Sequence, residues 1–142
     1  MVDTVQALHE LLAKLAPELS PEPWAYLALR PGEAVPAEAF ALIREEEGDC
    51  AVVPLAWAEA EGRPAAFVAA RITLRVRSEL AATGLTAAVS RRLADAGVAC
   101  NVIAGLRHDH LLVPWQQREE ALSELHATAR EVPGAATGSH WA

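Results

Sequence analysis

The most regular alternation of hydrophobic and polar residues lies between Phe67 and Arg77, in the sequence FVAARITLRVR. A period of two is typical of a β-strand with one buried face. The apolar face carries Ile72, Leu74 and Val76. The polar face carries Arg71, Thr73, Arg75 and Arg77. The pattern therefore predicts a strand that places one face in the core and a row of cations on the other.

That row of arginines needs an explanation, because like charges on one strand face repel each other unless they are solvated or paired. A solvated face, or one paired by salt bridges between units, is the simplest interpretation. The alternatives are attraction of an anionic ligand and docking against the acidic run from Glu45 to Glu47.

Other segments show either the helical period of about 3.6 residues or a short apolar run typical of a strand. Helical spacing of apolar residues predicts helices at residues 3–16, 84–96 and 116–130. Short apolar runs predict strands at residues 24–30, 50–55, 98–104 and 110–114. Two segments stay open: residues 37–49 fit a short helix or a strand leading into a tight turn, and residues 56–64 fit a short helical turn or a loop. The segments 78–84 and 105–109 are predicted loops.

From residue 67 onward the predicted order is strand, helix, strand, strand, helix. One further strand would complete the α+β, ferredoxin-like βαββαβ plan with antiparallel sheets packed by helices. That strand is not evident after Arg130, so an N-terminal strand or a partner chain is expected at the open edge. The expected division is an N-terminal unit at residues 1–64, which is possibly incomplete, a C-terminal unit at 65–132, and a frayed tail at 133–142.

Composition and charge narrow the function classes. The chain has 142 residues, a formal net charge of −7 and a pI of about 5.2, so it lacks the basic footprint of a nucleic-acid binder. Two cysteines, Cys50 and Cys100, form no disulfide scaffold and suit a reducing compartment. The N-terminus does not fit a signal peptide and no apolar run reaches membrane-spanning length. We expect a cytoplasmic protein with no nucleic-acid or membrane partner.

Several motifs occur in one order: GLTAAVS from Gly84, NVIAG from Asn101 and HDHLLVP from His108, with the acidic-glycine segment IREEEGD upstream. In this order they resemble the bacterial family of small stand-alone proteins that carry two ACT-type units in tandem. The resemblance covers roughly residues 8 to 128. It implies a regulatory or sensor protein that binds an amino acid or a related metabolite, without a cofactor, often at an interface between two units.

The resemblance also implies a ligand site in the loop between the first strand and first helix of the second unit. The expected ligand-binding residues are Ser78, Glu79, Leu80, Thr83, Gly84, Leu85, Asn101, His108 and His110. The residues themselves allow this, since a helix N-terminus attracts a carboxylate and Glu79 would suit an amino group. The alternative is structural: Thr83 caps the helix and Gly84 permits a tight entry.

The run His108, Asp109, His110 admits three interpretations. Histidines at i and i+2 of a strand share a side, as a metal would need, but no further ligand has a fitting spacing. A structural hairpin corner with Asp109 bonding local backbone is favoured, followed by a ligand or interface role. For Asn101, in the strand VACNVIA, both a ligand contact and a structural hydrogen bond stay open.

Catalytic motifs are absent from the sequence. It has no G-x-S-x-G, P-loop or G-x-G-x-x-G motif, and both cysteines fall in predicted strands. The leading hypothesis is a homodimeric, non-catalytic regulatory protein that binds an amino acid. A protein-interaction module that has lost ligand binding is the alternative, and an enzyme using His108 or His110 as acid or base is a weaker third.

Overall fold

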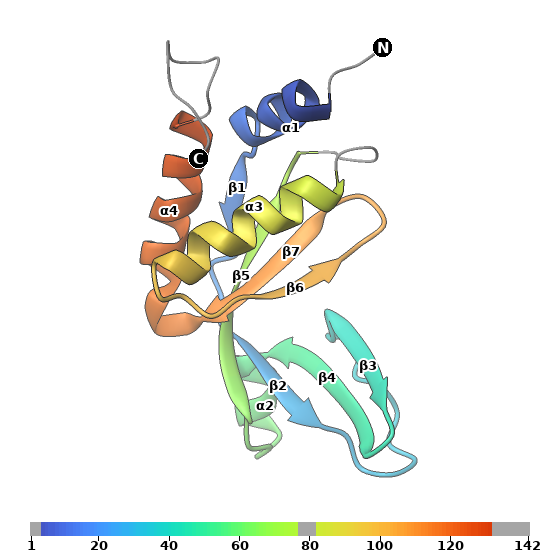
Figure 1. Ribbon diagram of the computed structural model, residues 1–142. Coiled ribbons are helices and arrows are strands. Elements are labelled where there is room, and N and C mark those ends of the chain that lie inside the picture. The colour runs from blue at the N-terminus through green and yellow to red at the C-terminus, as the bar shows by residue number, and fades with distance from the viewer. Residues whose placement is uncertain (1–3, 77–81, 132–142) are drawn as a thin grey trace.

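The computed structural model describes residues 4–76 and 82–131. The helices are α1 (Thr4–Ala13), α2 (Leu55–Ala60), α3 (Ala82–Asp95), the 3-10 turn η1 (Trp115–Gln117) and α4 (Arg118–Arg130). The strands are β1 (Pro17–Leu19), β2 (Trp24–Ala28), β3 (Ala41–Glu45), β4 (Gly48–Pro54), β5 (Phe67–Leu74), β6 (Asn101–Ala104) and β7 (Asp109–Pro114). Figure 1 shows α1, α3 and α4 around one half of a single sheet, with α2 beside the other half.

All the strands join one antiparallel sheet in which β5 takes part in both halves. The order is β3-β4-β2-β5-β7-β6, and β1 also pairs with β5. The first residues of β5 pair with β2, as in Trp24 opposite Ala69, and its last residues pair with β1, as in Leu19 opposite Ile72. β1 and β2 therefore follow one another along the same side of β5.

β1 supplies the strand that the C-terminal half lacks. The order β1-β5-β7-β6, with α3 after β5 and α4 after β7, is the ferredoxin-like arrangement. Of the two expectations for this edge, an N-terminal strand or a partner chain, the first is confirmed, and so is the α+β, ferredoxin-like fold class. The pattern did not reveal β1 itself, because it is three residues long and begins with Pro17. Proline is tolerated at the first residue of such an edge strand.

The N-terminal half is built differently. Its sheet has the order β3-β4-β2, and β2 pairs with the first residues of β5. Within residues 17–66 the structure contains one helix, α2. The open choice for residues 37–49 resolves to a strand and tight turn, with Gly48 at a φ of +139° in the β3–β4 hairpin. Residues 29–40 connect β2 to β3. Arg63 fastens this connection by donating hydrogen bonds to Glu33 at 2.6 Å and to the Ala28 carbonyl at 3.0 Å.

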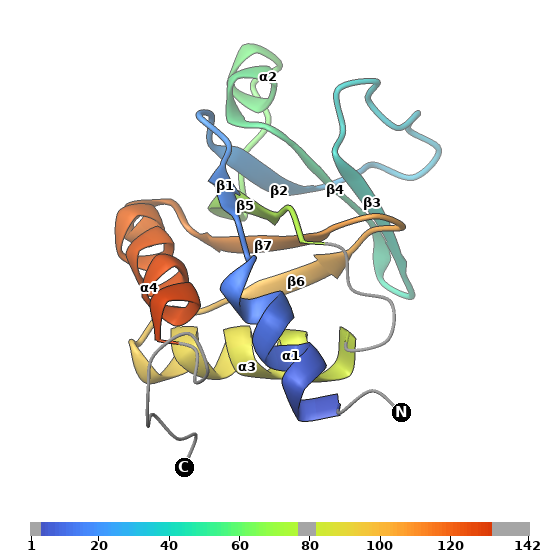
Figure 2. The ribbon, with the colours of Figure 1, turned by 90° about the horizontal axis from the view of Figure 1, so that it is seen from above.

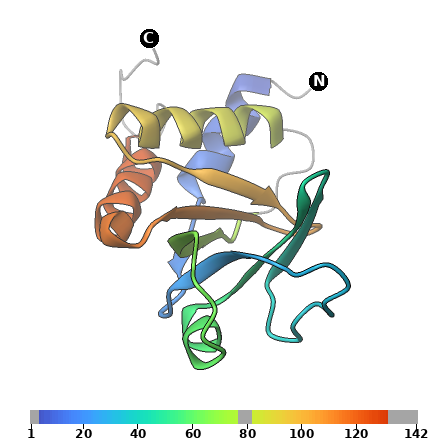
Figure 3. The ribbon, with the colours of Figure 1, turned by 90° about the horizontal axis from the view of Figure 1, so that it is seen from below.

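Two apolar cores lie on the same face of the curled sheet, one over each half, because Ala25 of the smaller core pairs with Val68, which shares a face of β5 with Ala70 and Ile72. The larger one packs α1, α3 and α4 on β5 and β7, as Figure 2 shows from above. Its fully buried members include Leu12, Leu15, Ile72, Leu111 and Leu125. The smaller core packs α2 on β2 and β4, around Leu27 and Val53. Figure 3 shows the sheet between α3 and α2.

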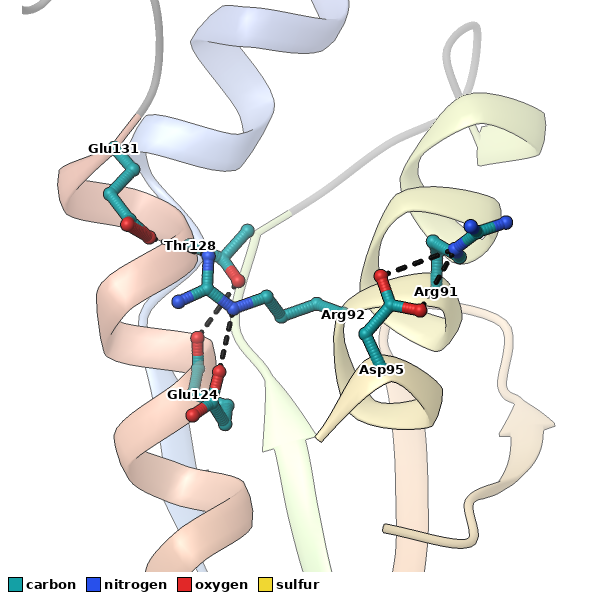
Figure 4. A network of polar contacts seen from close by, with 6 residues as sticks. All are labelled: Arg91, Arg92, Asp95, Glu124, Thr128 and Glu131. Atoms are coloured by element: carbon teal, nitrogen blue, oxygen red, sulfur yellow. Dashed lines mark hydrogen bonds and ion pairs between the residues drawn. The ribbon is translucent and has the colours of Figure 1, made fainter. Parts of the chain in front are cut away.

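Arg92 ties the two C-terminal helices together. It projects from α3 and contacts two carboxylates of the α4 segment, Glu124 at 2.7 Å and Glu131 (Figure 4). Its neighbour Arg91 instead pairs with Asp95 on the same helix, and both of those side chains are largely exposed. Arg92 therefore forms ion pairs between helices, whereas Arg91 forms an ion pair within α3.

The predicted alternation along β5 is confirmed. Ile72 and Leu74 are buried among the helices, and Val76 packs against the same core. On the other face Arg75 donates to Glu18 of β1 at 2.6 Å rather than to the acidic run at residues 45–47. Arg71 lies on that face too, and it is part of the candidate site.

Candidate functional site

The predicted ligand loop lies only partly within the described residues. Ser78, Glu79 and Leu80 fall outside them, and so does the side chain of Thr83. The helix starts at Ala82, two residues earlier than the pattern predicted, so Gly84 lies in its first turn. A Cβ at Gly84 would lie 3.0 Å from Cδ2 of Leu8 on α1. Gly84 thus allows a close approach of two helices, which is a packing role.

Leu85 faces the interior. Its side chain is 1% exposed and belongs to the core that α3 shares with β5 and β7. Only the backbone of Leu85 would therefore be available to a ligand. Among the predicted site residues whose side chains the structure describes, Leu85 is the one that lies in the core.

A small polar pocket, here called the hairpin pocket, lies at the end of β5. It is lined by Val76 and residues 105–109, and its volume is about 50 Å³. The Gly105 N–H donates to the His108 carbonyl at 2.9 Å, which closes the turn between β6 and β7. The Nδ1 atom of His108 is buried and has no hydrogen-bond partner among the described residues. A buried ring nitrogen without a partner is costly, so this atom marks a place where a polar group would be stabilised.

His110 is held from several sides. Its Nδ1 is 3.0 Å from the Thr73 hydroxyl, and its ring meets Phe40 edge-on at a centroid distance of 5.0 Å. A Cβ at Gly105 would come within 3.4 Å of its Nε2. Burial lowers the pKa of His110, and the nearby charges of Arg71 and His108 lower it further. At neutral pH the ring is therefore neutral, which suits the hairpin-corner interpretation. The described residues contain no group of three metal-ligating side chains.

Arg71 is clamped between aromatic rings that the sequence did not connect with it. Its guanidinium carbon lies 4.4 Å from the ring centroids of both Trp24 and Phe40. Its Nε is buried and lacks a hydrogen-bond partner in the described part of the chain. Burial lowers the pKa of Arg71, and Glu22 opposes that effect. The alternation in residues 24–30 places Trp24 on a strand face, but the contact of Phe40 depends on the long connection after β2.

A larger cavity, here called the cleft, opens at the other end of β5. It has a volume of about 480 Å³ and is lined by residues 26–29, 45, 47–50, 66–67 and 101. Asn101 is exposed and lines it, so it lies apart from the hairpin pocket. The sequence reasoning placed Asn101 correctly on the face opposite Val102, which packs on the helical core. It did not anticipate the aromatic neighbours Tyr26 and Phe67.

The cysteine thiols favour no nucleophilic chemistry. Both are half-buried, and neither forms a disulfide. Burial raises the pKa of Cys100 to about 11 and also raises that of Cys50, where Glu45 adds to the effect. A thiol with such a pKa is protonated at neutral pH and is a poor nucleophile.

Comparison with known proteins identifies the two halves. ACT domains match twice, at residues 4–70 and at residues 70–127. A protein of unknown function from Vibrio cholerae, described as a possible transport protein, is 33% identical, with a TM-score of 0.79 over 89% of this chain and 99% of that one. No curated protein sequence matches. Among the described residues, no helix is long and apolar enough to cross a membrane.

More distant structures share the fold. The ligand-free regulatory subunit of aspartate kinase from Thermus thermophilus is 11% identical, with a TM-score of 0.60 over 81% of this chain and 97% of that chain. A protein from Agrobacterium tumefaciens is 20% identical, with a TM-score of 0.57 over 80% of this chain and 87% of that one. At these identities the likeness concerns the fold alone.

Proposed function

Because the chain belongs to the ACT-domain family, we propose that it is a non-catalytic regulatory protein that binds an amino acid or a closely related metabolite. ACT domains are regulatory ligand-binding modules, and both family matches of the chain are ACT domains. The observation that carries the finer proposal is the buried, unpartnered Nδ1 of His108, a residue that lines the hairpin pocket beside the end of β5.

The hairpin pocket supports a polar contact with part of a ligand. Its volume of about 50 Å³ suits one small polar group of an amino acid, not the whole molecule. The N-terminus of α3 follows β5 in the chain, and its free N–H groups and dipole favour a carboxylate. The remaining contacts would come from the predicted residues Ser78 to Thr83 and from a neighbouring unit.

Regulation would follow from where the ligand lies. A ligand held between two units stabilises the arrangement to which it binds more tightly, and no other property lets it act as a switch. We propose that the second unit is supplied within a homodimer, with the ligand near their interface. The chain would then act in a reducing, cytoplasmic setting on a partner protein.

The test is a thermal-shift screen of the intact protein against the twenty amino acids. A ligand at 100 times its Kd that binds only the folded state adds about 2.7 kcal/mol to the free energy of unfolding, which is a shift of several degrees. His108→Ala should abolish the shift, whereas His126→Ala should preserve it, because His126 is an exposed histidine on α4.

Two results would count against the proposal. If no amino acid shifts the melting temperature of a well-folded dimer, the alternative of an interaction module without a ligand is favoured. If a shift persists unchanged in His108→Ala, the protein binds an amino acid but not at the hairpin pocket.

A further inference from the structure

The cleft differs from the hairpin pocket in size, position and charge. Its volume of about 480 Å³ falls in the range of small-molecule sites, which is roughly 300–1,000 Å³. It involves Phe67, the first residue of β5, whereas the hairpin pocket involves Val76, beyond the last residue. At about 3.3 Å per residue, these two residues lie roughly 30 Å apart along the chain. The two cavities share no lining residue.

We propose that the cleft is a second binding site, and that it takes a small amphiphilic cation: a primary amine carried on an apolar, ring-sized body. This proposal does not depend on the amino-acid site, because it rests on different residues.

The body of the ligand would lie against aromatic side chains. Tyr26 and Phe67 are opposite each other on β2 and β5, and their rings meet edge-on at a centroid distance of 5.8 Å. Both line the cleft. Each aromatic side chain is only half-buried, so it retains apolar surface that a ligand would cover.

The positive charge proposed for the ligand follows from the acidic side chains that line the cleft. Glu45 and Glu47 line the cleft from the β3–β4 hairpin, and neither forms an ion pair with another described residue. In the β3–β4 register Ile43 pairs with Cys50, so Glu45, two residues further on, shares the sheet face of Cys50, which lines the cleft. The lining includes no lysine, arginine or histidine. An ammonium group is therefore complemented by the rim, and an anion is repelled.

Neutral polar groups at the cleft add directional contacts. The Tyr26 hydroxyl keeps its proton at neutral pH, since burial raises its pKa. The exposed Asn101 side chain offers a carbonyl oxygen as acceptor for an ammonium N–H. Neither group brings a positive charge, so both leave the preference for a cation intact.

The experiment is calorimetric titration of the full chain with three probes of one shape: phenethylamine, phenylacetate and 2-phenylethanol. Phenethylamine should bind, binding should weaken as salt is added, and phenylacetate should not bind. The double variant Glu45→Gln, Glu47→Gln should weaken phenethylamine binding about five- to tenfold, which is the effect expected of two exposed ion pairs.

The matched control is Glu119→Gln, Glu120→Gln, which removes the same charge from exposed positions in the first turn of α4. It should leave the affinity unchanged. Backbone NMR should place the perturbed resonances at Tyr26, Phe67 and Asn101. Absence of phenethylamine binding, equal binding of phenylacetate, or equal weakening by both double variants would overturn the proposal. Perturbation confined to residues 105–109 would overturn it as well, while supporting the hairpin pocket.

Discussion

Single residues at the β6–β7 hairpin determine the shape of the hairpin pocket. Gly105 lies where any Cβ would press on the carbonyl oxygen of His108, at 3.0 Å, and on the ring of His110. The positions of the two histidines therefore depend on the absence of a Cβ at Gly105 as well as on their own contacts. The sequence located this corner, but it gave no sign of the close approach, which depends on the ring position of His110.

Gly105→Ala should therefore lower the free energy of unfolding by about 1 kcal/mol, because a backbone carbonyl and a clamped ring have little room to move. Gly84→Ala is the matched comparison. Its Cβ would also meet an atom at 3.0 Å, but that atom is the end of the flexible Leu8 side chain. Alanine also favours the helix by roughly 1 kcal/mol, so the net change should be near zero. Urea unfolding of both variants checks this, and equal losses would contradict the argument.

Cys100 should make stability depend on pH in the alkaline range. Its folded pKa of about 11 exceeds the ordinary value of about 8.5, so the folded state keeps a proton that the unfolded chain releases. The stabilisation is complete below about pH 8.5 and is lost as pH rises toward 11. The loss should be about 1–2 kcal/mol, less than the full pKa difference implies, because the thiol is partly exposed.

Unfolding of Cys100→Ala across this pH range should show a correspondingly shallower decline. Cys50→Ala provides the comparison, because burial raises the pKa of the second thiol as well. A decline of the same steepness in wild type and Cys100→Ala would show that other groups cause it.

At the scale of elements, most helices and strands could be predicted because each buries one periodic face. The pattern of residues 84–96 gave α3 and the glycine that ends it, since Gly97 has a φ of +76°. The exceptions have local causes. β1 is too short to show a period, and residues 37–49 carry both a helical composition and a glycine turn. The aromatic clamp on Arg71 joins residues more than thirty positions apart in sequence, so no local pattern predicts it.

The contact between α3 and α4 yields a comparison of two adjacent arginines. Arg92→Met should cost about 1 kcal/mol, because Arg92 joins two helices and both Arg92 and Glu124 are about 30% exposed. Arg91→Met should cost less than about 0.5 kcal/mol, since its pair with Asp95 is exposed and lies within one helix. Thermal unfolding at low salt measures both, and a double-mutant cycle with Glu124→Gln isolates the pair. A larger loss for Arg91→Met would contradict this assignment.

At the scale of the molecule, the two halves share strand β5. The predicted boundary between residues 64 and 65 stays a prediction, and the two ACT matches meet at residue 70, inside β5. The C-terminal half takes its edge strand and the core side chains Leu12 and Leu15 from the N-terminus. This edge strand is seen only from the long-range pairing of β1 with β5. The sequence pattern therefore could not decide whether an N-terminal strand or a partner chain lies there.

A fragment beginning at residue 65 should therefore fail to unfold cooperatively. It would expose one side of β5 and lose two fully buried leucines, each contributing roughly 2 kcal/mol. Joining residues 1–22 to the end of this fragment through a flexible linker should restore a cooperative transition, because α1 packs beside α4. Circular dichroism during urea titration distinguishes these results. Cooperative unfolding of the fragment alone would disprove the dependence.

The position of β5 has a mechanical consequence. A strand is close to the maximum extension of its backbone, so it transmits displacement along its length instead of stretching. β5 runs from Phe67 at the cleft toward Val76 at the hairpin pocket, and it is hydrogen-bonded to both halves. A small shift of β5 along its axis at one end would therefore displace the other end as well. We expect the strand to resist extension along this line, so that a displacement at one cavity would reach the other through β5 itself.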